Sequence, residues 1–125
     1  MQFHRESATG LNMIRAIRED AIQVGERWHS GNLIVAPDAI VPDWTPRNMA
    51  LLDERHLEAV WSLEPELVLL GSGSSIAFPA PRVLALGQVR GIGMEVMDTA
   101  AACRTYNILA SEGRKVAAAL IITAR

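Results

Sequence analysis

A short run of glycine and serine at residues 71–75 (Gly-Ser-Gly-Ser-Ser) is the clearest candidate for ligand chemistry in this sequence. It follows the apolar run 67–70, which predicts a strand, and open α/β sheets bind ligands at loops that follow their strands. A phosphate-binding P-loop would continue with Gly-Lys-Ser/Thr, but this run lacks the lysine and leads to Pro79 and Pro81 instead. A dinucleotide fingerprint would need a third glycine where Ile76 stands. We therefore predict a tight turn at the sheet edge, with ligand binding as the alternative.

Nucleophilic and metal-binding residues follow no recognisable pattern along the chain. The loop serines lie in no Gly-x-Ser-x-Gly elbow, and His4, His29 and His56 form neither an HxH nor an HxxxH pair. Cys103 is the only cysteine and falls within a predicted helix, where a free cysteine is usually a small buried apolar group. We accordingly predict no catalytic residue, no metal site and no cofactor.

Polar residues gather around two predicted strand ends in the last third of the chain. They are Glu95, Asp98, Thr99, Arg104, Thr105, Tyr106, Asn107, Glu112, Arg114 and Lys115. Asp98 directly precedes a helical stretch and is a suitable N-cap, but with Arg104 and Asn107 it could also line a crevice closed by the glycine loop. The alternative is a structural network of caps and ion pairs. The candidate ligand-binding residues are therefore Gly71, Ser72, Gly73, Asp98, Arg104 and Asn107.

Short apolar stretches separated by turn residues organise the first third of the chain. The stretches 13–17, 21–24 and 33–36 predict an antiparallel meander. Three prolines then mark a connector with one short edge strand near 38–41. From Asp53 the apolar residues recur at helical spacing, which predicts a capped helix of about 11 residues before Pro65.

The rest of the chain alternates between strand and helix patterns. Strands are predicted at 67–70, 92–97 and 115–122, with helices between them at 82–90 and 99–112. Such alternation implies parallel pairing through right-handed crossovers. We predict an α/β fold in one compact domain over residues 1–125, with a mixed sheet, an N-terminal antiparallel meander and a C-terminal βαβαβ parallel portion. One core should hold Leu69, Val96, Leu120 and Trp61.

Charge and composition narrow the classes of partner. The 125 residues include 12 basic and 14 acidic ones, a formal net charge of −2 that creates no general attraction to nucleic acid. A single cysteine allows no internal disulfide and suits a reducing compartment. The first seven residues contain no apolar stretch like that of a signal peptide, and the apolar run 116–122 is too short to span a membrane. We expect a cytoplasmic protein without an integral membrane segment.

One long block of the sequence has a recognisable likeness. Residues 91–120 read GIGMEVMDTAAACRTYNILASEGRKVAAAL. With its Met-Asp-Thr, Thr-Tyr-Asn and Glu-Gly-Arg motifs, this block resembles the bacterial branch of the domain of unknown function shared with mitochondrial complex I assembly factor 3. The stretch 31–44, the Pro-Glu-Leu at 65–67 and the glycine loop are similar too, although Ser72 stands where members often carry threonine. The resemblance implies a compact α/β fold with a mixed sheet, and it supplies no catalytic residues.

Two classes of function follow from these observations. The resemblance implies a non-enzymatic binding or assembly protein, with protein partners such as subunits of a respiratory complex. The residues themselves leave open a small-molecule or enzymatic role at the crevice between the glycine loop and the helix that Asp98 begins. Self-association through a sheet edge, or through the region of Trp28 and Trp44, is a further hypothesis.

Overall fold

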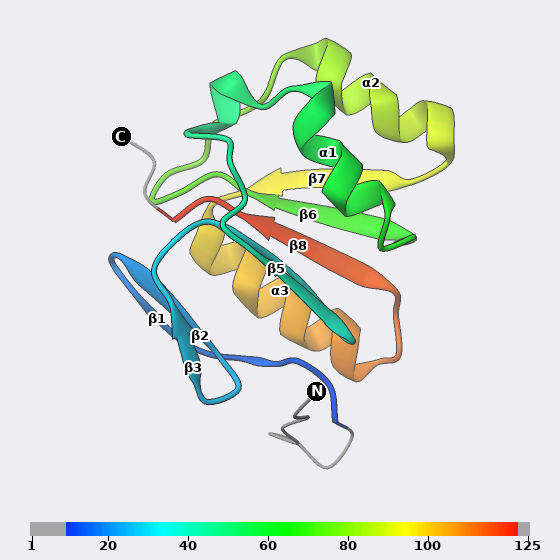
Figure 1. Cartoon of the computed structure of the whole chain (residues 1–125). Helices are drawn as coiled ribbons and strands as arrows, with labels where there is room; N and C mark the ends of the chain where they lie inside the picture. Colours follow the sequence, from blue (N-terminus) through cyan, green and yellow to red (C-terminus); the bar gives the residue numbers. More distant parts are fainter. Residues whose placement is uncertain (1–9, 123–125) are drawn as a thin grey trace.

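Two β-sheets and four helical segments make up the described part of the chain, residues 10–122, in the computed structural model (Figure 1). The smaller sheet is antiparallel, with strands β1 (Ile14–Arg18), β2 (Ala21–Val24) and β3 (Arg27–His29). The larger sheet has the order β5-β4-β8-β6-β7, from β4 (Leu33–Ala36), β5 (Ala39–Pro42), β6 (Leu67–Gly71), β7 (Gly93–Met97) and β8 (Val116–Leu120). The helical segments are the 3-10 helix η1 (Met49–Leu51) and the α-helices α1 (Glu54–Trp61), α2 (Pro81–Arg90) and α3 (Thr99–Ser111).

Strand directions in the larger sheet follow the predicted pattern. β6 pairs in parallel with both β7 and β8, so the predicted parallel portion is confirmed. β4 runs antiparallel to β5 and to β8, which makes the sheet mixed, and β5 is the predicted short edge strand. Every residue of β8 is buried, as expected of a central strand that is covered on both faces.

The predicted meander is divided between the two sheets, which corrects the sequence-based assignment. β1 and β2 pair as predicted, but the third strand of their sheet is β3, which the sequence pattern did not indicate. β4 was expected to complete the meander and instead lies between β5 and β8. All four residues of β4 are buried, whereas those of β3 are exposed or half-buried. A continuously apolar strand needs cover on both faces, and the larger sheet provides it.

Helices lie on both faces of the larger sheet, and two cores result (Figure 1). α1 and α2 cover one face, while α3 and the smaller sheet lie on the other. The side chains of β8 alternate between the two cores, as the pleat of a strand requires. Val116, Ala118 and Leu120 belong to the core on the α3 side, and Ala117 and Ala119 to the core on the α1 side.

The predicted single core of Leu69, Val96, Leu120 and Trp61 is wrong. Leu69 and Leu120 lie in the core on the α3 side, whereas Val96 and Trp61 pack against the core on the α1 side. Strand register explains the division. Val96 lies beside Leu70 in the β6–β7 pair, and Leu70 points to the opposite face of the sheet from its neighbour Leu69.

Helices α1 and α3 begin at the predicted caps, Asp53 and Asp98. The Asp53 carboxylate accepts from the amide of Glu54 at 2.6 Å, and Nδ1 of His56 accepts from the amide of Asp53 at 2.9 Å, which completes a capping box on α1. α1 has 8 residues rather than about 11, because the chain turns away after Ser62 through Glu64, whose φ is 53°. α3, with 13 residues, begins at the predicted position. Within residues 10–122 no helix is both long and apolar enough to cross a membrane.

Candidate functional site

The glycine loop at 71–75 closes on itself at the end of β6. The hydroxyl of Ser72 donates to the carbonyl oxygen of Ser75 at 2.7 Å and accepts from the amide of Ala77 at 3.0 Å. The amide of Ser72 donates to the carbonyl oxygen of Met97 at 2.9 Å and so extends the β6–β7 pairing by one residue. The buried side chain of Ser72 is therefore engaged in shaping the loop.

Thr99 joins this loop to the end of the sheet. Its hydroxyl accepts from the amide of Gly73 at 2.8 Å and donates to the carbonyl oxygen of Ile121 at 2.6 Å. Gly71 lies directly against it, and a Cβ at that position would be 3.0 Å from Oγ1 of Thr99 and 2.9 Å from Cδ2 of Leu120. Sequence reasoning did not place Thr99 among the site residues. The available signal was a hydroxyl residue directly after an N-cap, at the edge where parallel strands end.

Asp98 caps α3, as its position before the helix predicts. Its Oδ1 accepts from the amide of Ala101 at 2.8 Å, and its own backbone is extended. The carboxylate lies at the positive end of the helix, where a negative charge is stabilising. This hydrogen bond gives Asp98 a complete structural role beside the glycine loop.

Asn107, two turns further along α3, is joined to the smaller sheet. Its side-chain Nδ2 donates to the carbonyl oxygen of Ile14 at 2.8 Å, and its Oδ1 accepts from the amide of Ile14 at 2.9 Å. The neighbouring Tyr106 donates its hydroxyl to the carbonyl oxygen of Asn12 at 2.7 Å. Both side chains connect α3 to the segment that contains β1, not to the glycine loop.

The six candidate residues thus fall into two groups. The group at the end of β6 and the start of α3 contains Gly71, Ser72, Gly73 and Asp98. The group further along α3 contains the exposed Arg104 and the half-buried Asn107. Asn107 is nine residues beyond Asp98, roughly 13 Å along a helix that rises about 1.5 Å per residue. The first group forms a small hydrogen-bonded sheet edge, and Asn107 belongs to the attachment of β1.

Comparison with known proteins decides the family. Residues 14–121 match a family described as protein of unknown function (DUF498/DUF598). The chain belongs to the DUF498/DUF598 family. The resemblance noted in the sequence is therefore confirmed. The relatives that match include vertebrate assembly factors as well as bacterial proteins.

The relatives of this DUF498/DUF598 chain come from animals and bacteria. NADH dehydrogenase (ubiquinone) 1 alpha subcomplex assembly factor 3 of Bos taurus is 38% identical over 98 residues, covering 74% of this chain and 53% of that protein. The chain thus spans about half the length of this relative. An uncharacterized protein of Rhodobacter capsulatus is 34% identical over 93 residues, covering 74% of this chain and 70% of that one.

Solved bacterial structures share the fold of this family member. A crystal structure of a Bordetella parapertussis protein has a TM-score of 0.84 and 35% identity, covering 93% of this chain and 99% of that one. An NMR structure of a Xanthomonas campestris protein has a TM-score of 0.80 and 43% identity, covering 88% of this chain and 83% of that one. The architecture described above is therefore shared by these bacterial proteins of related sequence.

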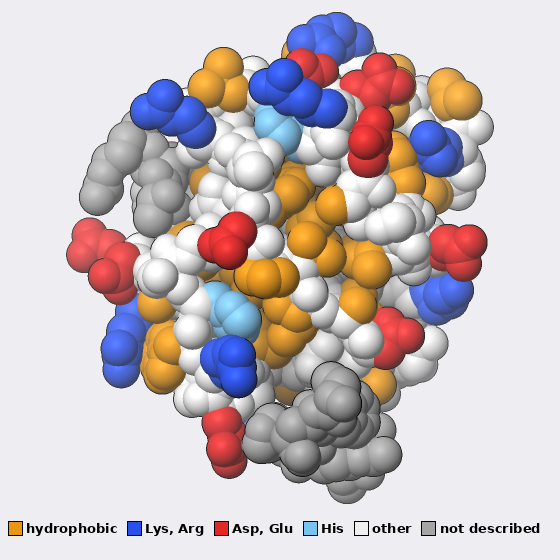
Figure 2. Space-filling view, viewed as in Figure 1, with side chains coloured by type: hydrophobic (Ala, Val, Ile, Leu, Met, Phe, Trp, Pro, Cys, Tyr) orange, Lys and Arg blue, Asp and Glu red, His pale blue; other side chains and the backbone are white. Residues whose placement is uncertain are grey.

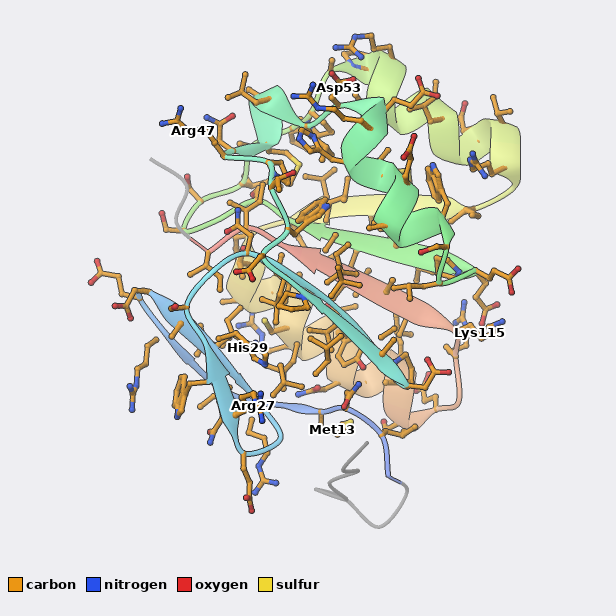
Figure 3. All side chains as sticks on the ribbon, viewed as in Figure 1. Met13, Arg27, His29, Arg47, Asp53 and Lys115 are labelled. Carbon is orange, nitrogen blue, oxygen red and sulfur yellow. The ribbon has the colours of Figure 1, made fainter. Side chains whose placement is uncertain are left out.

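A separate hollow of about 410 Å³ lies at the opposite end of the larger sheet from the glycine loop. Its apolar lining includes Leu11, Pro37, Leu63, Pro65, Ala110 and Val116. Asp38, Arg114 and Lys115 add charge to its lining, and Figure 3 shows Lys115 beside the start of β8. The Glu66 carboxylate accepts from the amide of Lys115 at 2.9 Å and from Nε of Arg114 at 3.2 Å, and these hydrogen bonds hold its pKa below the ordinary value. No local sequence pattern indicates this hollow, because residues from four separate segments of the chain form it.

Within the described residues, His29, His56 and Cys103 of this DUF498/DUF598 chain do not form a reactive set, and His4 lies outside the described residues. Burial and Arg27 lower the pKa of His29, which lies on β3 (Figure 3). Among the described residues, its Nε2 is buried without a hydrogen-bond partner. Burial raises the pKa of the Cys103 thiol to about 12, so this side chain is not a thiolate at neutral pH. No group of three or more His, Cys, Asp or Glu residues within 10–122 is arranged to hold a metal ion.

Proposed function

We propose that this chain is a non-enzymatic binding or assembly protein that assists the biogenesis of a respiratory complex. The observation that carries the proposal is the 38% identity, over 98 residues, to assembly factor 3 of Bos taurus. Since the chain spans about half of that protein, the proposal concerns the shared part alone. Its partners would be protein subunits of such a complex, met at the cytoplasmic side of the membrane.

The hydrogen bonds around the glycine loop support this proposal. Ser72, Thr99 and Asp98 each bind main-chain atoms of neighbouring segments, and these bonds determine how the loop and α3 begin. A catalytic serine or carboxylate needs an oxygen lone pair directed at a substrate, and a serine also needs a base within hydrogen-bond reach. The hydrogen bonds recorded for these three side chains instead hold main-chain segments together, which suits a binding surface.

Affinity purification from the native cell separates an assembly role from a small-molecule role. The tagged full-length chain is isolated, and both the proteins and the metabolites that accompany it are identified by mass spectrometry. We expect subunits of a respiratory complex and no recurring metabolite. A single metabolite bound in stoichiometric amount, with no respiratory protein, would contradict the proposal.

The second candidate function is small-molecule binding or catalysis at the crevice between the loop 71–75 and the start of α3. One observation favours it. The loop follows the carboxyl end of the parallel strand β6, where α/β sheets commonly bind ligands, and the side chains of Ser74 and Ser75 are exposed there. Turnover of a defined substrate that is abolished by substitution at this edge would favour this function.

Self-association is a separate proposal that concerns the edge of the larger sheet formed by β5, opposite the edge formed by β7. β5 is an edge strand whose Ile40 and Val41 are only half-buried. Figure 2 shows hydrophobic side chains gathered in the middle of the face over β5, with charged side chains around them. An edge of this kind can pair with another strand. Analytical ultracentrifugation of the full chain would show a dimer if this edge is used.

A further inference from the structure

The segment after the glycine loop exposes two large apolar side chains. Ile76 is 55% exposed and Phe78 is 62% exposed, and every residue from 74 to 78 is exposed. The residues on either side are not: 71–73 and Pro79 are buried. The tip 74–78 therefore projects from a buried base at the end of β6.

The base of this tip is fixed by hydrogen bonds. The hydroxyl of Ser72 bonds to both Ser75 and Ala77, so it closes the tip on one side. The amide and carbonyl groups of Gly73 both bond to Thr99, so α3 holds the other side. A tip that is already ordered loses little conformational entropy when it binds a partner.

We propose that the tip 74–78 is a docking element that inserts Ile76 and Phe78 into an apolar, uncharged pocket of a partner protein. Aromatic side chains that enter a desolvated pocket supply much of the energy of protein interfaces. The segment 71–81 contains no Asp, Glu, Lys or Arg, so it would bury no unpaired charge on binding. The proposal rests on the proposed assembly function in one respect only, the expectation that the partner is a respiratory subunit.

Charge favours a protein partner over a lipid surface. Attraction to anionic lipid requires basic residues beside the inserted side chains, and the segment 71–81 has none. The next residue, Arg82, lies 3.8 Å from a carboxylate oxygen of Asp53, which offsets its charge. The chain as a whole has a formal net charge of −2. Insertion into a bilayer is therefore the outcome that the test must distinguish from docking.

Site-specific photocrosslinking in the native cell tests the proposal. The full-length chain carries p-benzoylphenylalanine at position 76, at position 78, or at position 108 as a matched control. Ile108 is 58% exposed on α3, so it is as accessible as the two tip residues. We expect one discrete protein adduct from positions 76 and 78 and none of that protein from position 108. Adducts to lipid, adducts to a second copy of this chain, or equal adducts from all three positions would overturn the proposal.

Affinity measurements complete the test, with the partner protein identified by crosslinking and then purified in its free form. Phe78→Ser and Ile76→Ser should each weaken the binding of this partner about tenfold or more, because each removes an apolar side chain that the complex would bury. Ile108→Ser should leave the affinity unchanged. Unchanged affinity in both tip variants would overturn the proposal, and since both side chains are exposed, thermal unfolding should show that these variants fold normally.

The two proposals fail in different ways. If the crosslinked protein binds through the tip but belongs to no respiratory complex, docking stands and the assembly function fails. If a deletion strain lacks a respiratory complex, and a chain that carries both Phe78→Ser and Ile76→Ser restores that complex fully, the assembly function stands and docking through the tip fails.

Discussion

The side chain of Asn107 forms two hydrogen bonds with the main chain of Ile14, one in each direction. Ile14 is the first residue of β1, and Asn107 lies in the second half of α3. The asparagine amide thus takes the place of a neighbouring strand, and it fastens the smaller sheet to the helix that covers the larger sheet. The two residues are 93 positions apart in the sequence.

Asn107→Ala should lower the free energy of unfolding by about 1–3 kcal/mol, because two hydrogen bonds are lost and the main-chain groups of Ile14 are left without their partners. Asn107→Asp keeps the acceptor but turns a carboxylate oxygen toward the carbonyl oxygen of Ile14, so it should be at least as destabilising as Asn107→Ala. Urea denaturation of the three proteins measures this order. Equal stability of Asn107→Ala and the parent would show that the attachment of β1 does not depend on this pair.

Thr99→Val should destabilise the protein by about 1–3 kcal/mol, because valine has the shape of threonine but leaves the amide of Gly73 and the carbonyl of Ile121 unpaired in a buried place. Thermal unfolding measures the loss, and hydrogen exchange of the Gly73 amide should become faster. Thr99→Ser is the control, since it keeps the hydroxyl. If valine and serine behave alike, the hydroxyl is not what holds the loop.

Asp98→Ala should cost about 0.5–2 kcal/mol, the usual effect of removing an N-cap. Asp98→Asn retains the oxygen that accepts from the amide of Ala101, so it should be nearly as stable as the parent and should keep biological activity. Thermal unfolding and complementation of a deletion strain, on the same variant, measure the two properties. A stable but inactive Asp98→Asn protein would make the carboxylate a functional group at the crevice.

Stability should decrease as the pH falls below about 6.5, the ordinary pKa of histidine. Burial, with the charge of Arg55, lowers the pKa of His56 in the folded state. Between the lowered pKa of the folded state and about 6.5, the unfolded chain binds more protons than the folded chain, so acid favours unfolding. Well above about 6.5 the effect is absent, because the imidazole is neutral in both states. Protonation would also remove the acceptor Nδ1 from the capping box with Asp53.

His56→Gln is the matched variant for this pH effect. Glutamine is a normal residue at this position of a capping box, so the variant should fold with similar stability at neutral pH. Its loss of stability on acidification should be smaller than that of the parent, with His29, whose pKa is also lowered, accounting for part of the rest. Denaturation curves at a series of pH values give the comparison, and identical pH profiles would exclude His56 as a source.

Local signals made most of the helices and the parallel strands predictable. Asp53 and Asp98 each stand directly before the helix that they cap, so the cap can be read from adjacent residues. Strands that alternate with helices pair in parallel because the helix between them carries the chain back across the sheet. The partner of β4 was not predictable in this way. Its pairing with β8 joins Leu33 to Leu120, and no residue near Leu33 in the sequence indicates that contact.

The same distinction applies to the candidate site. Gly71, Ser72 and Gly73 were found because a glycine run after a strand is a local pattern, and Asp98 because it precedes a helix. Asn107 was grouped with them because it is a polar residue on the same helix. Its real partner, Ile14, lies at the other end of the chain, and only the folded structure reveals that its amide is already in use.

The amount of assembled respiratory NADH dehydrogenase in a deletion strain tests the proposed assembly function most directly. Native gel electrophoresis of its membranes, with activity staining, measures that amount alongside a second respiratory complex as an internal control. We expect a specific loss of the NADH dehydrogenase, full restoration by the parent chain and by Ile108→Ser, and poor restoration by Phe78→Ser. A deletion strain with normal amounts of the complex would contradict a role in its assembly.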